Sequence, residues 1–170
     1  MVQLTAVINA LSKFLSYIPL GVSRKQGELI FSLVLHGAPL RYSWTNFVNL
    51  VRQHNLETTF GTNYKFIEGN NPFGMNVPSW SPYVQGSIGS VGTARYANIS
   101  QAVADRITWD KRNNISGWSS TYLEELVQHH YNNSPTYPNA VAGTKGYETA
   151  LLVASALVPA SIIGIGYLVK

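Results

Sequence analysis

The chain has 170 residues, of which 45% are hydrophobic and 12% are charged, so it fits one folded domain and is not a disordered acidic chain. It contains no cysteine, which excludes disulfides and thiolate metal sites, and its four histidines lack the spacing of metal ligands. The net charge is +4, but the 12 Lys and Arg residues form no basic run, so we expect no nucleic-acid partner, no metal and no cofactor.

The first 20 residues predict an amphipathic helix, because apolar residues recur at helical spacing and Lys13 interrupts them. A signal peptide would need a basic start, which this stretch lacks. Docking on the following domain is the simpler interpretation, and a position in a membrane surface is the alternative. The apolar positions are Leu4, Ile8, Leu11, Leu15 and Ile18.

A second helix is predicted to begin after Ser43, which can cap it, and to run to about Glu57. Its apolar face contains Trp44, Phe47, Val48 and Val51. At about 100° per residue, Glu57 falls well away from that face. We therefore expect its carboxylate to leave the core and face a cleft near the end of the helix.

The middle of the chain predicts a mainly α domain of α+β class over residues 21–146. Residues 69–93 are rich in Pro and then Gly, which indicates a loop followed by a short β-hairpin. Helical spacing resumes at residues 98–112 and 121–131, and Thr121 and Glu124 have the spacing of a capping box.

The C-terminal segment, residues 149–169, carries no charge. It is long enough for a transmembrane helix, which needs about 20 apolar residues. We predict a membrane anchor over residues 147–170, and a buried core helix is the alternative. The flanking Lys145 and Lys170 do not indicate an orientation.

Two runs in the middle of the chain, LETTFGT at residues 56–62 and NNPFGM at residues 70–75, resemble the glucosaminidase-like peptidoglycan hydrolases of the lysozyme-like superfamily. In that family a helix ends on a catalytic Glu, and an Asn-Asn-x-Phe-Gly loop follows. The runs ARYAN at residues 94–98 and NSPTY at residues 133–137 resemble two later motifs of the family. The similarity covers residues 43–142 and implies a lysozyme-like domain with a small β-hairpin lobe.

The resemblance implies that Glu57 is a general acid, which protonates the glycosidic oxygen between two amino sugars. It also implies that Tyr96 and Tyr137 line the cleft. Asn71 is expected to bind substrate or its own turn, and Phe73 to hold the loop against the domain. Trp80 and Tyr83 are candidates for stacking on sugar faces.

The sequence departs from a common glycosidase pattern, in which two carboxylates act together. No Asp or Glu lies between Met75 and Ala104. Assistance by the substrate's N-acetyl group, or attack by its 6-hydroxyl as in lytic transglycosylases, would leave Glu57 as the sole essential carboxylate. Asp105 and Asp110 remain as candidates for a second one, although ion-paired or solvated roles fit their predicted helix better.

The function predicted from the sequence is a membrane-anchored enzyme that cleaves the glycan strand of peptidoglycan. We expect it in the virion of a membrane-containing phage, with capsid or other virion proteins as further partners, and the bacterial envelope is the alternative location. The other function predicted is a catalytically silent structural or glycan-binding virion protein with the same fold. The bond that is cut and the type of product stay open.

Overall fold

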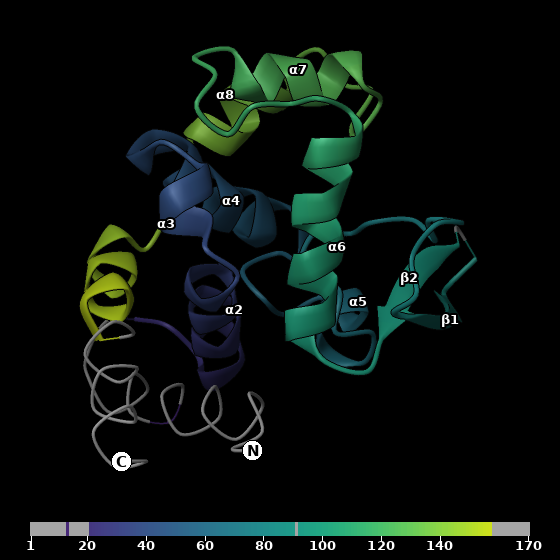
Figure 1. Cartoon of the computed structure of the whole chain (residues 1–170). Helices are drawn as coiled ribbons and strands as arrows, with labels where there is room; N and C mark the ends of the chain where they lie inside the picture. Colours follow the sequence, from purple (N-terminus) through teal and green to yellow (C-terminus); the bar gives the residue numbers. More distant parts are fainter. Residues whose placement is uncertain (1–12, 14–20, 91, 158–170) are drawn as a thin grey trace, which may run out of the picture.

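The structure is a computed structural model and describes residue 13, residues 21–90 and residues 92–157. The described chain is mainly helical, with one small antiparallel sheet of two strands (Figure 1), as the α+β prediction requires. The predicted amphipathic helix at residues 1–20 lies outside the described residues except for Lys13.

The named helices and strands follow one another along the chain from α2 to α8. Residues 148–157 form a further helical stretch after α8. The bounds are α2 Arg24–Leu35, α3 Ala38–Arg41, α4 Trp44–Glu57, α5 Tyr64–Ile67, β1 Val84–Ile88, β2 Thr93–Tyr96, α6 Ile99–Arg112, α7 Tyr122–Gln128 and α8 Tyr137–Ala142.

Side-chain caps fix where the long helices begin. The Ser43 hydroxyl accepts a hydrogen bond from the Asn46 backbone N–H at 3.2 Å, which confirms the predicted start of α4. Asn98 caps α6 in the same way. The capping box predicted for α7 is wrong, because the Thr121 hydroxyl donates to the Glu125 carboxylate at 2.9 Å and makes no cap bond.

The two strands form the Gly-rich hairpin predicted from the sequence. Val84 pairs with Tyr96 and Ile88 pairs with Thr93, and the pairing is irregular between Val84 and Gly86. Figure 1 shows the hairpin to one side of the helices, beyond α6. The residues that precede it, 69–83, return toward α4 and supply one wall of the cleft described below.

The core is apolar and lies among α2, α4, α6 and the helices after them. Leu29, Phe31 and Leu33 of α2 are fully buried, as are Leu50 of α4 and Val103 of α6. The helices α2 and α4 are buried over most of their length, and in α4 the buried residues include polar ones such as Gln53 and His54.

The beginning of the predicted membrane anchor packs against this core. Ala150, Leu151 and Ala154 are 1%, 0% and 0% exposed and belong to the main hydrophobic cluster. For residues 148–157 the structure therefore corresponds to the core helix that was the alternative interpretation. Within the described ranges, no helix has the length and apolar character that a membrane span requires. Residues 158–170, the rest of the predicted anchor, lie outside the described residues.

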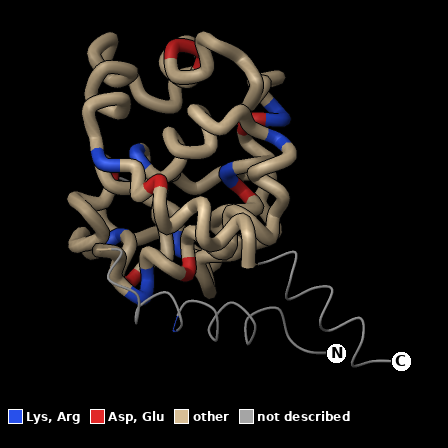
Figure 2. The backbone as a smooth tube through the Cα atoms, turned by 90° about the vertical axis from the view of Figure 1, so that its left-hand side faces the viewer, with Lys and Arg blue, Asp and Glu red and all other residues tan. Residues whose placement is uncertain are grey.

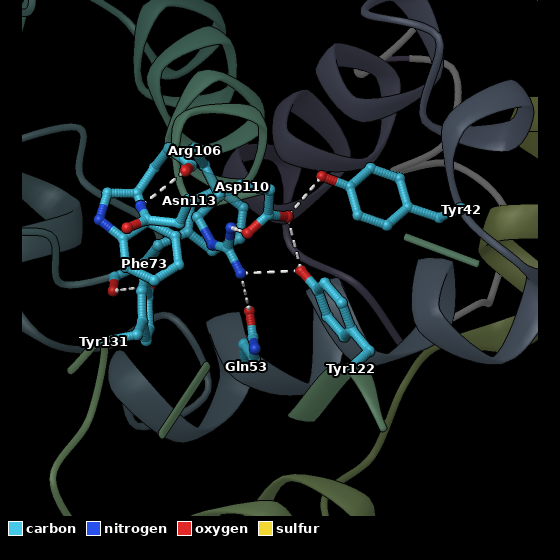
Figure 3. A network of polar contacts seen from close by, with 9 residues as sticks. Tyr42, Gln53, Phe73, Arg106, Asp110, Asn113, Tyr122 and Tyr131 are labelled. Carbon is cyan, nitrogen blue, oxygen red and sulfur yellow. Dashed lines mark hydrogen bonds and ion pairs between the residues drawn. The ribbon is translucent and has the colours of Figure 1, made fainter. Parts of the chain in front are cut away.

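One buried polar network ties the helices together (Figure 3). Arg106 of α6 pairs with Asp110 one turn later, and its guanidinium also donates to Gln53 of α4 at 3.2 Å. Asp110 in turn accepts from the hydroxyls of Tyr42 at 2.7 Å and Tyr122 at 2.8 Å. Tyr42, α4, α6 and α7 are thus joined through one ion pair.

The other charges are spread over the molecule. Figure 2 shows Lys and Arg distributed along the described chain and mixed with Asp and Glu, without a continuous basic stripe. This distribution agrees with the absence of a basic run in the sequence.

Candidate functional site

Glu57 is the last residue of α4, and the chain turns sharply after it. Thr58 follows, and its hydroxyl donates to the His54 carbonyl at 2.6 Å and accepts from the Gly61 N–H at 2.9 Å. Thr59, Phe60 and Gly61 have φ angles of 50°, 56° and 81°. This left-handed turn ends the helix, so the Glu57 side chain projects from a rigid helix end.

The opposite wall is the loop after α5, and Asn71 holds its shape. The Asn71 amide donates to the carbonyls of Met75 at 2.8 Å and Ala94 at 2.9 Å, and its oxygen accepts from the Met75 N–H at 3.1 Å. Gly74 has a φ of 63°, and a Cβ there would lie 3.1 Å from Glu57 Oε2. A residue without a side chain therefore lets the loop lie against the carboxylate.

A cleft of about 410 Å³ opens between these walls. It is lined by Glu57, the loop at residues 73–80, Trp109 of α6 and residues 130–132 after α7. Glu57 is the one carboxylate in this lining, and the other side chains are aromatic, apolar, amide, hydroxyl and imidazole groups. Such a mixture suits a polar ligand with flat faces, because aromatic rings offer stacking and amides offer hydrogen bonds.

Burial raises the pKa of Glu57 above its usual value of 4.5, although the neighbouring Tyr137 and Asn132 side chains lower it in part. The Tyr137 hydroxyl is buried beside the carboxylate and has no hydrogen-bond partner of ordinary geometry among the described residues. No cation forms an ion pair with Glu57 in the described part of the chain. The carboxyl can therefore hold a proton at a higher pH than a solvated one.

The buried network reaches the cleft through Tyr131. Its hydroxyl donates to the Phe73 carbonyl at 2.6 Å, which joins the two loops that flank the cleft (Figure 3). The Arg106 guanidinium lies 4.7 Å from the Tyr131 ring centre and 5.9 Å from that of Phe73. The fully buried Arg106 side chain thus contacts one aromatic ring from each of the two loops.

His54 lies one turn before Glu57 and is fully buried. Its Nδ1 is 3.1 Å from the Pro72 carbonyl, so this nitrogen carries the proton and donates. Burial lowers the pKa of His54 to about 4, which makes the ring neutral at pH 7. His54 therefore connects α4 to the loop at residues 70–75, which is the structural role and not the exposed one of the two that the sequence left open.

The sequence-predicted residues fall into two groups. Glu57, Phe73 and Trp80 line the cleft, and Tyr137 lies directly beside Glu57. The Trp80 ring also lies 5.2 Å from the guanidinium of Arg112 on α6.

The remaining predicted residues do not line the cleft. Asn71 is fully buried and bonds its own loop, as one of the two expectations had it. Tyr96 is 1% exposed and packs against Ala94 and Ala102, and Tyr83 is an exposed residue just before β1.

The candidates for a second carboxylate lie elsewhere. Asp110 is held by Arg106 and two tyrosine hydroxyls, which fits the ion-paired role expected of it. Asp105 is buried, accepts a hydrogen bond from Ser81 and lies beside Tyr96. Burial raises the pKa of Asp105, with partial compensation from Ser81 and Tyr96.

Sequence reasoning missed Trp109, His130, Tyr131 and Asn132, which complete the cleft. Trp109 lies on a predicted helix and gave no signal that separates it from a core residue. The other three lie beyond the end of α7, immediately before the NSPTY run, and no motif of the resemblance includes them.

Comparisons with known proteins inform the fold alone. No protein-family model matches the chain, and no curated protein matches its sequence. Its structure is similar to a chain of a type VI secretion system effector–immunity complex from Pseudomonas protegens, with a TM-score of 0.50 and 15% sequence identity. The match covers 89% of this chain and 90% of the other. The glucosaminidase-like resemblance consequently stays a prediction from sequence.

Proposed function

We propose that this protein cleaves the glycan strand of peptidoglycan, with Glu57 as the proton donor and with a lysozyme-like arrangement of the domain around the cleft. The observation that carries the proposal is the position of Glu57: a partly buried carboxyl with a raised pKa, no ion-pair partner in the described chain, and an open cleft in front of it. A general acid must be protonated when substrate arrives, and burial favours that state.

The chemistry would begin with transfer of the Glu57 proton to the oxygen that links two amino sugars. As the bond between this oxygen and the anomeric carbon breaks, positive charge develops on the sugar, and Glu57 becomes a carboxylate beside it. The aromatic rings of Trp80 and Trp109 would contact sugar faces, and the Asn132 amide, which also lines the cleft, would bind a polar group of the substrate.

A second step must supply a nucleophile without help from another cleft carboxylate. Attack by the substrate's own 6-hydroxyl would form an anhydro sugar, and Glu57 would recover its proton from that hydroxyl. Assistance by the N-acetyl group, followed by attack of water, would give a reducing end. Either route needs one carboxylate that acts first as acid and then as base, which is what the described lining offers.

The biological setting remains a prediction from sequence. A phage virion that must cross a cell wall, or a bacterial envelope, would both suit an enzyme that acts locally beside a membrane. Attachment to that membrane would involve residues beyond the core helix at 148–157, since three residues of that helix are buried in the domain.

The test is digestion of purified peptidoglycan by the whole chain, with wild type, Glu57→Gln and Glu68→Gln compared and the products identified by mass spectrometry. Glu68 is an exposed carboxylate 11 positions further on and is the matched control. Loss of a general acid lowers the rate by about 10²–10⁴-fold. We expect Glu57→Gln to show that loss and Glu68→Gln to digest like wild type.

Failure of all three proteins on several wall types, with folding verified by circular dichroism, would contradict the enzyme proposal. The alternative, a silent glycan-binding protein, would then be favoured if the wild type still bound glycan strands. An active Glu57→Gln variant would contradict the role of Glu57.

A further inference from the structure

A second surface hollow lies on the other side of α6 from the cleft. Two adjoining depressions, of about 230 and 240 Å³, share Arg41, Ile107 and Lys111 in their linings. One extends to His36 and Thr108, and the other extends to residues 115–117. We call this continuous hollow, bounded by α3 and α6, the α6 groove.

The periodicity of α6 explains why the groove and the cleft are separate. Ala104, Ile107, Thr108 and Lys111 follow the spacing i, i+3, i+4 and i+7, so they share one face of the helix. Trp109 is on a different face and lines the cleft. A ligand in the groove would therefore not compete with a glycan beside Glu57.

The groove contains cations without anionic partners. Arg41 and Lys111 are exposed and make no ion pair or side-chain hydrogen bond with any residue in the described ranges. Other cations are engaged: Arg24 pairs with Glu28, and Arg52 pairs with Glu148. Two uncompensated charges on one concave surface produce a positive potential.

The one carboxylate in the lining does not neutralise that potential from the groove side. Asp110 is 3% exposed, and its oxygens are directed to Arg106 and to the hydroxyls of Tyr42 and Tyr122. Arg106 already balances its charge. Arg41 and Lys111 therefore face the groove as a pair of free cations.

The remaining lining offers both polar and apolar contacts. Thr108 supplies a hydroxyl, and His36, whose Nε2 lies 2.9 Å from the Ser100 hydroxyl, presents an imidazole at one end. Ala104 and Ile107 form an apolar surface between these groups. An anion with a short aliphatic portion fits this combination better than a bare inorganic ion.

We propose that the α6 groove binds the phosphate group of a phosphate ester such as a glycerophosphate. An Arg guanidinium and a Lys ammonium on one concave surface are suited to phosphate, because the guanidinium donates two parallel hydrogen bonds and the ammonium acts as a point charge. The Thr108 hydroxyl supplies a further donor, and the aliphatic part of the ester contacts Ile107. This site is independent of the proposed enzyme activity.

The same phosphate ester occurs in two settings, a polyol-phosphate wall polymer and a phospholipid headgroup. The experiment therefore has two arms, which both use the full chain. In the first, sn-glycerol 3-phosphate is titrated into the protein and binding is followed by NMR, with glycerol as the uncharged control. In the second, the protein is mixed with vesicles of phosphatidylglycerol or of phosphatidylcholine and sedimented.

The variants are Arg41→Gln and Lys111→Gln, with Arg95→Gln as the matched control. Arg95 is an exposed residue of β2, so its substitution removes the same charge at a site away from the groove. We expect each groove variant to weaken glycerol 3-phosphate binding about tenfold or more, since each loses a charge-assisted contact. The control is expected to bind like wild type.

The titration of His36 gives a readout that a loss of folding would not produce. Burial and the nearby Arg41 lower the pKa of His36, with Ser100 acting in the opposite direction. Lys111 of α6 is the other cation that lines the same groove. A phosphate bound among these groups would raise the pKa of His36 in wild type and not in the groove variants.

Saturable binding of glycerol 3-phosphate that the groove variants weaken and the control does not would support the proposal. Vesicle binding with the same dependence on Arg41 and Lys111 would identify the lipid headgroup as a source, and soluble binding without vesicle binding would support the site and exclude the headgroup as its ligand. No saturable binding, or equal weakening in all three variants, would overturn the site.

Discussion

Asp110 and Glu57 are both carboxylates beside tyrosine side chains, yet their surroundings differ in one decisive respect. Asp110 has a buried guanidinium and two donated hydroxyls, so its charge is matched on all sides. Glu57 has no such cation in the described chain, and the buried Tyr137 hydroxyl beside it makes no well-formed hydrogen bond. The first arrangement holds helices together, and the second leaves a carboxyl free to exchange a proton with a ligand.

The two regions also depend on one another. Arg106 pairs with Asp110 on one side and lies under Tyr131 and Phe73 on the other. The ion-paired network therefore supports the loops that form the cleft. A carboxyl without a cation, placed beside an ion-paired network, is the arrangement expected when preorganisation and reactivity occur in one small domain.

The largest expected effect is the loss of the buried cation. Arg106→Met would leave the Asp110 carboxylate buried without its ion-pair partner, and breaking such a pair costs about 3–5 kcal/mol of unfolding free energy. Urea denaturation followed by circular dichroism measures it. Arg95→Gln, an exposed substitution, is expected to stay within about 0.5 kcal/mol of wild type.

Combining Arg106→Met with Asp110→Asn should cost less than the sum of the two single changes, because the uncompensated charge is then absent. Strict additivity would show that the pair does not act as a unit, which would undermine the contrast between the two carboxylates.

A smaller effect is expected at Asn71, which lies in the wall of the cleft and is entirely buried. Asn71→Ala would leave the carbonyls of Met75 and Ala94 and the Met75 N–H without their partner, at a cost of about 2–4 kcal/mol in unfolding free energy. Asn139→Ala, at an exposed position of α8, is the control. Unchanged stability with a loss of glycan binding would instead assign Asn71 to substrate.

The smallest effect, of opposite sign, concerns Glu57 itself. Burial raises the pKa of the Glu57 carboxyl in the folded protein. The contribution of this group to the free energy of unfolding is therefore fully present below pH 4.5, its usual pKa, and is lost as the pH rises through the pKa of the folded state. Glu57→Gln should therefore be more stable than wild type at pH 7, and the gain should disappear below about pH 4.5. Unfolding measured from pH 4 to pH 8 tests this.

Glu68→Gln, which removes one negative charge at an exposed position, is the matched control. A Glu57→Gln variant that is less stable at pH 7 would mean that the carboxylate is held by favourable partners, as Asp110 is. The contrast between the two regions would then fail.

Much of the secondary structure followed from local signals. Ser43 and Asn98 cap the helices that they precede, and the Gly-rich run at residues 84–93 lies in the hairpin, because caps and turns depend on neighbouring residues. The apolar segment after residue 149 was harder, since a core helix and the start of a membrane helix have the same composition. For residues 148–157 only the tertiary packing of Leu151 and Ala154 distinguishes the two, and the rest of the predicted anchor lies outside the described residues.

The site was predictable to the extent that it lies on regular structure. Helical periodicity predicted that Glu57 lies away from the apolar face of its helix, and the resemblance predicted that the loop around Phe73 belongs to the site. The contributions of Tyr131 and Asn132 depend on how a loop after α7 folds back over α4, which no periodicity encodes. The burial of Arg106 was equally hidden, because an arginine on a helix is normally exposed.

The central claim is that Glu57 is a proton donor whose pKa is raised by its place in the cleft. The most direct measurement is a ¹³C NMR titration of the Glu57 carboxyl in the full chain, compared with the pH dependence of kcat/KM on peptidoglycan. The account predicts a Glu57 midpoint above 4.5 and a loss of activity on the alkaline side at the same pH. A midpoint at or below 4.5, or an alkaline limb unrelated to it, would contradict the account.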